Sequence, residues 1–169
     1  MLLIKTRGLA MPNIKIREAT VEDTPLIFNF IKQLAIYEKA EDAVVATEDD
    51  IKKSIFSDSS SAYALIALLD DKPVGFSVYF YNYSTWLGKN GLYLEDLFVL
   101  PEYRGAGIGK ALLKQLAKIA IKNNCGRFEW SVLDWNQPAI DFYQSIGAKP
   151  QDEWIIYRLA GDALKEFAK

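Results

Sequence analysis

One stretch of this chain, residues 92–110 with the sequence LYLEDLFVLPEYRGAGIGK, constrains its fold more than any other. Residues 92–100 are apolar and aromatic apart from two adjacent acids, which predicts a strand with a functional interruption. Residues 101–103, Pro-Glu-Tyr, predict a turn. Residues 104–110 carry glycine at three alternate positions and predict a loop that opens a helix.

The glycine loop is suited to binding an anion. Glycine lets the backbone approach a ligand closely, and the start of a helix presents unpaired N–H groups and the positive end of the helix dipole. A phosphate is the usual occupant of such a site. A purely structural turn is a weaker interpretation, because a simple turn does not need three glycines behind an arginine.

Two familiar phosphate motifs do not fit this loop. A P-loop ending at Lys110 needs glycine at 104 and Ser or Thr at 111, where the chain has Arg104 and Ala111. A dinucleotide fingerprint starting at Gly105 needs glycine at 110, which is lysine. The loop therefore calls for another class of phosphate-containing ligand.

Composition limits the chemistry. The chain has no histidine and one cysteine, Cys125, which excludes Ser-His and Cys-His nucleophiles, histidine-ligated zinc and multi-cysteine metal sites. We therefore expect no metal. Any general acid or general base must therefore be Glu, Asp, Tyr or Lys, or a group of the substrate itself. A net charge of −2 does not favour nucleic acid, which calls for a basic surplus.

Length and hydropathy predict one domain without a membrane span. A chain of 169 residues is the usual size of a single domain. The longest unbroken apolar run, residues 62–69, is far too short to cross a membrane, and the first residues lack the apolar run of a secretory signal. We expect a cytoplasmic protein with no membrane partner. Residues 1–12 are interpreted as an extension, with Met11 as a candidate natural start, and 13–169 as the domain.

Hydrophobic periodicity and turn signals predict alternating strands and helices. The first strand lies near 14–19, and a long helix ends near Ala40. The other predicted elements are a helix at 47–56, strands at 63–69, 74–83 and 92–100, a helix to about 123, a strand at 127–133, a helix from 136 ending at Gly147, a strand at 154–159 and a helix from 162. This order predicts an α/β fold with a mixed sheet.

Several motifs carry a family resemblance. Arg104-Gly105-x-Gly107-x-Gly109 after a strand resembles the acetyl-CoA pyrophosphate loop of the GNAT (Gcn5-related) N-acetyltransferase superfamily. An ordered set of segments is similar to the diamine (spermidine/spermine) and thialysine acetyltransferase branch. These segments are Trp86-Leu87-Gly88-Lys89, Leu94-Glu95-Asp96, Tyr103-Arg104-Gly105, Trp135-Asn136-Gln137-Pro138 and residues 136–143. The resemblance runs from about Ile14 to the C-terminus.

The resemblance implies a single α/β domain whose mixed, mostly antiparallel sheet is flanked by helices. The sheet is expected to splay between the 92–100 and 127–133 strands, with acetyl-CoA in the split. Many family members are dimers, so a homodimer is expected. The implied acetyl-CoA contacts are Leu97, Phe98, Val99, Arg104, Gly105, Ala106, Gly107, Ile108, Gly109, Lys110, Asn136 and Tyr143.

The implied reaction is acetyl transfer from acetyl-CoA to a primary amine. The amine attacks the thioester directly, so no protein nucleophile is needed, in keeping with the lack of histidine. Tyr143 matches the family's general acid, and its reference pKa of about 10 keeps it protonated at neutral pH. Glu95 is the candidate for taking the amine proton. A core tyrosine and a structural salt bridge are the respective alternatives.

The implied acceptor contacts are Glu38, Trp86, Glu95, Asp96 and Trp154. Acids inside an apolar strand are costly without partners, which argues for a function of Glu95 and Asp96. As neighbours on a strand they would point to opposite faces unless a bulge intervenes. A cationic polyamine or diamine and a thialysine-like amino acid both fit. Alternatives are an acetyltransferase for another amine, such as an amino acid or a protein N-terminus, and an acetyl-CoA-binding module without efficient catalysis.

Overall fold

The computed structural model describes residues 13–169 and divides into two compact units, one ending at Ser131 and one spanning Val132–Lys169. The extension predicted at 1–12 and the candidate start at Met11 lie outside the described residues. One domain covering both units remains a prediction.

The first unit is built on a five-stranded sheet in the order β1-β2-β3-β4-β5. The strands are β1 (Ile14–Glu18), β2 (Ala62–Leu69), β3 (Lys72–Ser84), β4 (Lys89–Val99) and β5 (Arg127–Trp130). Neighbours are antiparallel except β5, which runs parallel to β4. The predicted α/β fold with a mixed, mostly antiparallel sheet is confirmed.

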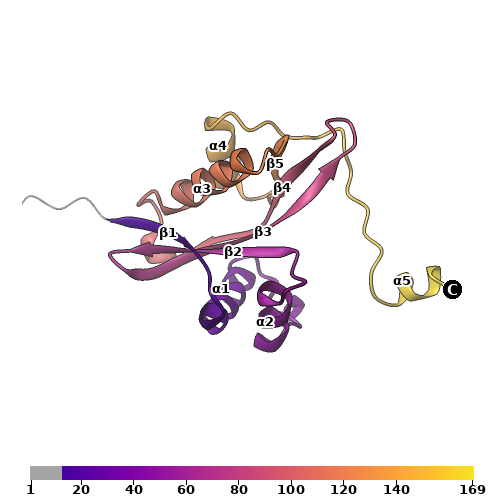
Figure 1. Ribbon diagram of the computed structural model, residues 1–169, viewed down its shortest axis with the longest axis horizontal. Coiled ribbons are helices and arrows are strands. Elements are labelled where there is room, and N and C mark those ends of the chain that lie inside the picture. The colour runs from indigo at the N-terminus through magenta and orange to yellow at the C-terminus, as the bar shows by residue number, and fades with distance from the viewer. Residues whose placement is uncertain (1–12) are drawn as a thin grey trace, which may run out of the picture. The chain divides into compact units, whose positions relative to one another are not determined.

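Helices cover both faces of this sheet (Figure 1). The helices α1 (Thr24–Tyr37) and α2 (Glu48–Phe56) lie on one face, and α3 (Ile108–Lys122) lies on the other. Short 3-10 turns link them: η1 (Val21–Asp23), η2 (Glu41–Ala43) and η3 (Pro101–Tyr103). The last of these turns connects β4 to the glycine loop.

An aromatic core fixes α1 to the sheet. The Phe30 ring stacks on Phe76 with centroids 5.5 Å apart, and Phe98 lies 6.2 Å away. Ile27 and Ile66 are completely buried beside them. Because such cores are packed to crystal density, α1 has a defined place against the end of β4.

The C-terminal end of α1 differs from its prediction. The helix ends at Tyr37 and not near Ala40, because Lys39 adopts a left-handed conformation with φ of 58°. The amide of Ala40 then donates back to the carbonyl of Ala35 over 2.9 Å, which closes the helix in a Schellman motif. Glu38 thereby becomes the C-cap residue, with its backbone fixed.

The second unit contains the helices α4 (Gln137–Ser145) and α5 (Gly161–Phe167) and no strand. The strand predicted at 154–159 is absent, and the one predicted at 127–133 ends at Trp130. An apolar run predicts burial, but a strand also needs a neighbouring strand for its N–H and C=O groups, and this unit offers none to residues 154–159. The predicted helix end at Gly147 is confirmed by its φ of 89°.

Throughout residues 13–169, no helix combines the length and apolar character needed to span a bilayer.

Candidate active site

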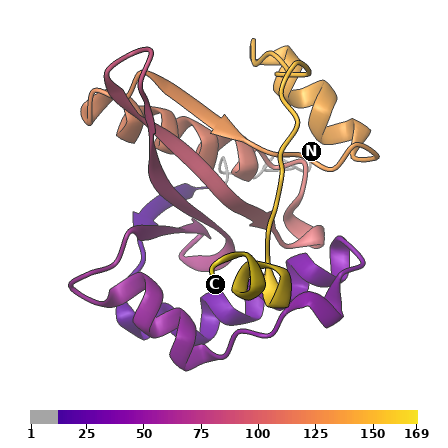
Figure 2. The same cartoon turned by 90° about the vertical axis from the view of Figure 1, so that its right-hand side faces the viewer.

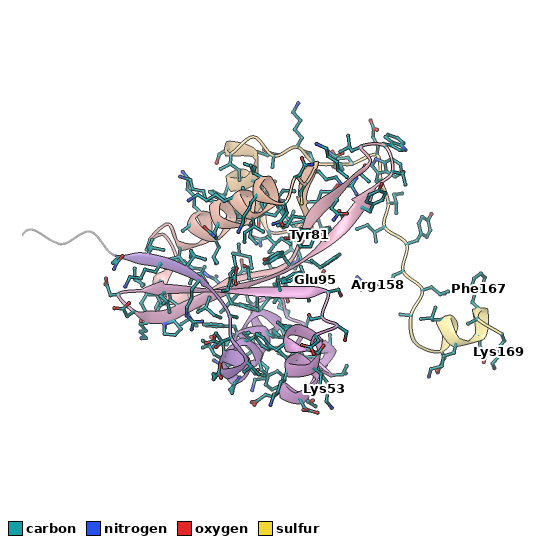
Figure 3. All side chains as sticks on the ribbon, in the orientation of Figure 1. Lys53, Tyr81, Glu95, Arg158, Phe167 and Lys169 are labelled. Carbon is teal, nitrogen blue, oxygen red and sulfur yellow. The ribbon has the colours of Figure 1, made fainter. Side chains whose placement is uncertain are left out.

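A β-bulge at Glu95 shapes the centre of β4. Figure 3 labels Glu95 on the sheet. Asp96 pairs with Val78 and Leu94 pairs with Tyr79, so the extra residue between them has no partner on β3. Residues directly opposite one another in an antiparallel pair share a face, so Asp96 lies on the face of the core residue Val78. The bulge interrupts the alternation that would otherwise place the two adjacent acids strictly on opposite faces.

Two of the predicted acceptor carboxylates, Glu95 and Glu38, act electrostatically on the third, Asp96. Asp96 is half-buried, whereas Glu95 is exposed. Burial, followed by the negative charges of Glu95 and Glu38, raises the pKa of Asp96 to about 6. Burial also raises the pKa of Glu38 above its ordinary value. A bound cation would favour the ionised form of these carboxylates and so offset both their mutual repulsion and the cost of burying them. The cluster is therefore suited to a positively charged ligand.

Beside these acids the sheet loses its last strand, and the splay that the family resemblance implies stays a prediction. Pairing between β4 and β5 is confined to residues 91–94 and 127–130. Beyond Leu94, the edge of β4 that faces β5 has no strand beside it among the described residues, and this stretch carries Leu97, Phe98 and Val99. Backbone groups on such an edge can pair with an extended ligand.

The glycine loop has the geometry of an anion site. Gly105 and Gly107 have φ values of 82° and 85°, which favour glycine, and a Cβ at either position would point into open space. Gly107 is the N-cap of α3 and makes no side-chain cap, so the first N–H groups of the helix, from Ile108 onward, remain available. Ala106 and Lys110 are exposed beside them.

The Arg104 side chain is bound by the protein itself. Its Nε donates to the carbonyl oxygen of Val99 over 3.0 Å, and its Cζ lies 4.4 Å from the centre of the Tyr37 ring. Sequence reasoning missed Tyr37 as a site residue because it fits the apolar pattern of α1. Its position directly before Glu38 was the one available signal.

Trp86 lies away from the carboxylates within this unit. It occupies the turn of the β3–β4 hairpin and is 86% exposed. The rise per strand residue puts this turn roughly 20 Å from Asp96 along β4. Figure 2 shows the turn at the end of the sheet far from α1 and α2. The structure does not bring Trp86 next to Glu95 and Asp96, and its acceptor contact remains a prediction.

The other predicted residues belong to the second unit. Asn136 is the N-cap residue of α4, but its side chain makes no capping hydrogen bond. Tyr143 lies in α4 with its ring 5.8 Å from that of Phe142, and Trp154 follows a turn, with its amide donating to the carbonyl of Gln151 over 3.1 Å. Their roles remain predictions.

A bulged acidic strand, an open strand edge and a glycine loop that opens a helix all lie in the first unit, where the acetyltransferase resemblance predicts them. The chain belongs to the acetyltransferase (GNAT) family, which it matches over residues 27–148.

Two named acetyltransferases and one solved structure are similar to this chain over most of its length. Thialysine N-epsilon-acetyltransferase of Sus scrofa is 38% identical over 169 residues, covering 94% of this chain and 99% of the relative. The human spermidine/spermine N(1)-acetyltransferase-like protein 1 is also 38% identical, over 96% of this chain and 25% of the relative. The solved integron cassette protein VCH_CASS6 of V. cholerae has a TM-score of 0.77 and 34% identity, covering 92% of this chain and 98% of that one.

Proposed function

We propose that this acetyltransferase moves an acetyl group from acetyl-CoA to a primary amine of a small cationic acceptor. The acceptor is a polyamine or diamine, or a thialysine-like amino acid. The observation that carries this proposal is the half-buried Asp96 beside the bulge of β4, whose pKa is raised by burial and by the charges of Glu95 and Glu38. Several carboxylates in one place match a ligand with several positive charges. The names of the two similar acetyltransferases support the same acceptor class.

Acetyl-CoA fits the residues present. The glycine cradle at Gly105 and Gly107 leaves open space at the start of α3, which suits a pyrophosphate. The backbone N–H groups that donate to the pyrophosphate would come from residues 105–110. The open edge of β4 at 97–99 would pair with the pantetheine arm of acetyl-CoA. Asn136 and Tyr143 are proposed as further acetyl-CoA contacts on the strength of the family resemblance alone. The bound co-substrate supplies an activated acyl group.

Glu95 is proposed to remove the proton of the acceptor amine. An amine with a pKa near that of lysine, about 10, is protonated at neutral pH and must lose a proton before it can attack. Glu95 is exposed on the bulge, so it can receive this proton directly or through a water molecule. Asp96 and Glu38 would meanwhile hold the acceptor's positive charge.

Tyr143 is proposed to donate a proton to the leaving thiolate. The bond between nitrogen and the acetyl carbon forms, the bond between that carbon and sulfur breaks, and the sulfur takes the tyrosine proton. The nitrogen loses two protons in all: one to Glu95 before it attacks, and one to solvent once it is bonded to the acetyl carbon. Glu95 then passes its proton to solvent and Tyr143 regains one from solvent, so each acetyl transfer releases one proton net and the step balances.

The test is thiol release from acetyl-CoA in the presence of spermidine, spermine, putrescine, thialysine, lysine or no acceptor. Rapid release with one class of amine is expected and would identify the acceptor. Saturable acetyl-CoA binding with no release above the acceptor-free rate would contradict the proposal and indicate a binding module. A homodimer and a cytoplasmic location are further expectations, which light scattering and fluorescence microscopy of a tagged chain would test.

A further inference from the structure

The side chain of Arg104 links the glycine loop to the end of α1. Besides its hydrogen bond to the Val99 carbonyl and its contact with the Tyr37 ring, its Cζ lies 5.5 Å from the centre of the Phe98 ring. An arginine held by two aromatic rings and one hydrogen bond has a fixed place, because each contact restricts the same planar group. The first residue of the loop is therefore anchored to the last residue of α1.

The residue that follows this anchor is an acceptor carboxylate. Glu38 is the C-cap of α1, and its charge acts on Asp96. Like charges in a half-buried site repel one another, so the end of α1 has an electrostatic reason to move away from β4. The contact between Tyr37 and Arg104 opposes that movement.

We propose that Arg104 is a positioning residue for the acceptor site, which acts through Tyr37 to fix the end of α1, and with it Glu38, against β4. This inference rests on the proposed function, because it assigns Glu38 to the acceptor. It gives the glycine loop a second role: the residue that begins the loop for acetyl-CoA also shapes the site for the amine. Binding of the two substrates is then coupled, and the coupling is reciprocal.

The same turn offers a matched control. Lys72 donates through Nζ to the hydroxyl of Tyr103 over 2.6 Å and lies 5.1 Å from the centre of its ring. This contact anchors η3 through the β2–β3 hairpin and not through α1. Replacing Lys72 loosens the turn without touching the end of α1.

The experiment compares Tyr37→Leu, Tyr37→Phe, Arg104→Lys and Lys72→Met by steady-state kinetics with spermidine and with thialysine. Tyr37→Leu should raise KM for the amine roughly tenfold, the size expected for one lost cation–aromatic contact in a partly desolvated site. KM for acetyl-CoA should change less than about twofold, because Tyr37 lies outside the glycine loop. Lys72→Met should behave like the parent, and Tyr37→Phe, which keeps the ring, should raise KM for the amine less than Tyr37→Leu does. Arg104→Lys keeps the charge but loses the planar group, so it should also raise KM for the amine.

A second measurement separates positioning from general damage. In a Glu38→Gln background, Tyr37→Leu should add no further rise in KM for the amine, because the residue on which it acts is already lost. The inference would be overturned if Tyr37→Leu raised KM for the amine equally in both backgrounds. It would also be overturned if Tyr37→Leu raised KM for acetyl-CoA as much as KM for the amine. A failure of the proposed function is distinguishable, since the unaltered protein would then release no thiol with any amine. Thermal unfolding of each variant reports whether it folds.

Discussion

The carboxylate of Glu38, the C-cap of α1, contributes to the raised pKa of Asp96 on β4. This relationship crosses the interface between a helix and the sheet, and it joins two acids that are far apart in the sequence. Burial, the largest cause, and the neighbouring negative charges both disfavour the charged form of Asp96. The raised pKa gives the candidate acceptor site a measurable pH dependence.

The first prediction concerns activity against pH. A cationic acceptor binds the ionised form of Asp96, so kcat/KM for spermidine should rise as the pH passes through about 6. The Asp96→Asn variant should lack this step and have a lower kcat/KM at neutral pH. Initial rates across a series of buffers at constant ionic strength measure both. A step of unchanged position and height in the variant would assign it to another group.

Replacing Asp96 is also predicted to stabilise the folded protein. A carboxyl whose pKa is higher in the folded protein than in the unfolded chain destabilises the fold as the pH rises through the interval between the two values. Asp96→Asn should therefore raise the free energy of unfolding near neutral pH by about 2–3 kcal/mol. Below about pH 4, where Asp96 is protonated in both states, the gain should vanish. Urea unfolding at the two pH values tests this, and a gain that is the same at both would contradict it.

Glycine at position 75 is predicted to be required by packing. A Cβ there would lie 2.6 Å from the backbone oxygen of Phe98, which cannot move without distorting β4. Gly75→Ala should lower the free energy of unfolding by about 1–3 kcal/mol, the usual cost of overpacking. Gly109→Ala is the control, because its Cβ would make only an ordinary contact of 3.8 Å with Leu97 Cδ2 and α3 favours alanine. Equal unfolding midpoints for the two variants would refute the steric argument.

Strain at Lys39 predicts a stabilising change. Its φ of 58° is unfavourable for a residue with a Cβ and ordinary for glycine. Lys39→Gly should raise the free energy of unfolding by about 0.5–1 kcal/mol, after the larger entropy loss of glycine on folding is counted. Lys39→Ala keeps the strained backbone and should give no gain. Thermal unfolding of the three proteins measures the difference, and a gain in the alanine variant would point to the lysine side chain.

Local patterns predicted much of this molecule. The alternate glycines after Arg104 predicted the loop and the start of α3. The two acids inside an apolar strand coincide with a break in the register against β3, and the function assigned to them stays a prediction. These signals are local, because backbone conformation and the cost of buried charge depend on a few neighbouring residues. The ordered motifs implied a splay between β4 and β5; their pairing stops at Leu94, where β5 ends, and the splay itself stays a prediction.

Features that depend on contacts between distant segments were not predictable in the same way. The bulge at Glu95 is a matter of register with β3, and the contact of Arg104 with Tyr37 depends on how α1 packs. The end of α1 was misplaced because Lys39 takes a conformation usually marked by glycine. The strand expected at 154–159 shows the converse error: an apolar run was taken for a strand without a partner to pair with.

The last prediction tests the proposed acid. Tyr143→Phe keeps the ring in α4 and removes only the hydroxyl, so kcat for the best amine should fall by roughly 10²–10⁴-fold, the range for general acid–base catalysis. Binding of acetyl-CoA, measured by calorimetry, should remain within about threefold, because the loss falls on the transition state and not on the ground state. Tyr157→Phe is the matched control in the same unit, where Tyr157 is 91% exposed and has no proposed role. If both variants keep full kcat, the leaving thiolate takes its proton from elsewhere. If both lose activity alike, the effect is one of folding of the second unit and not of proton donation.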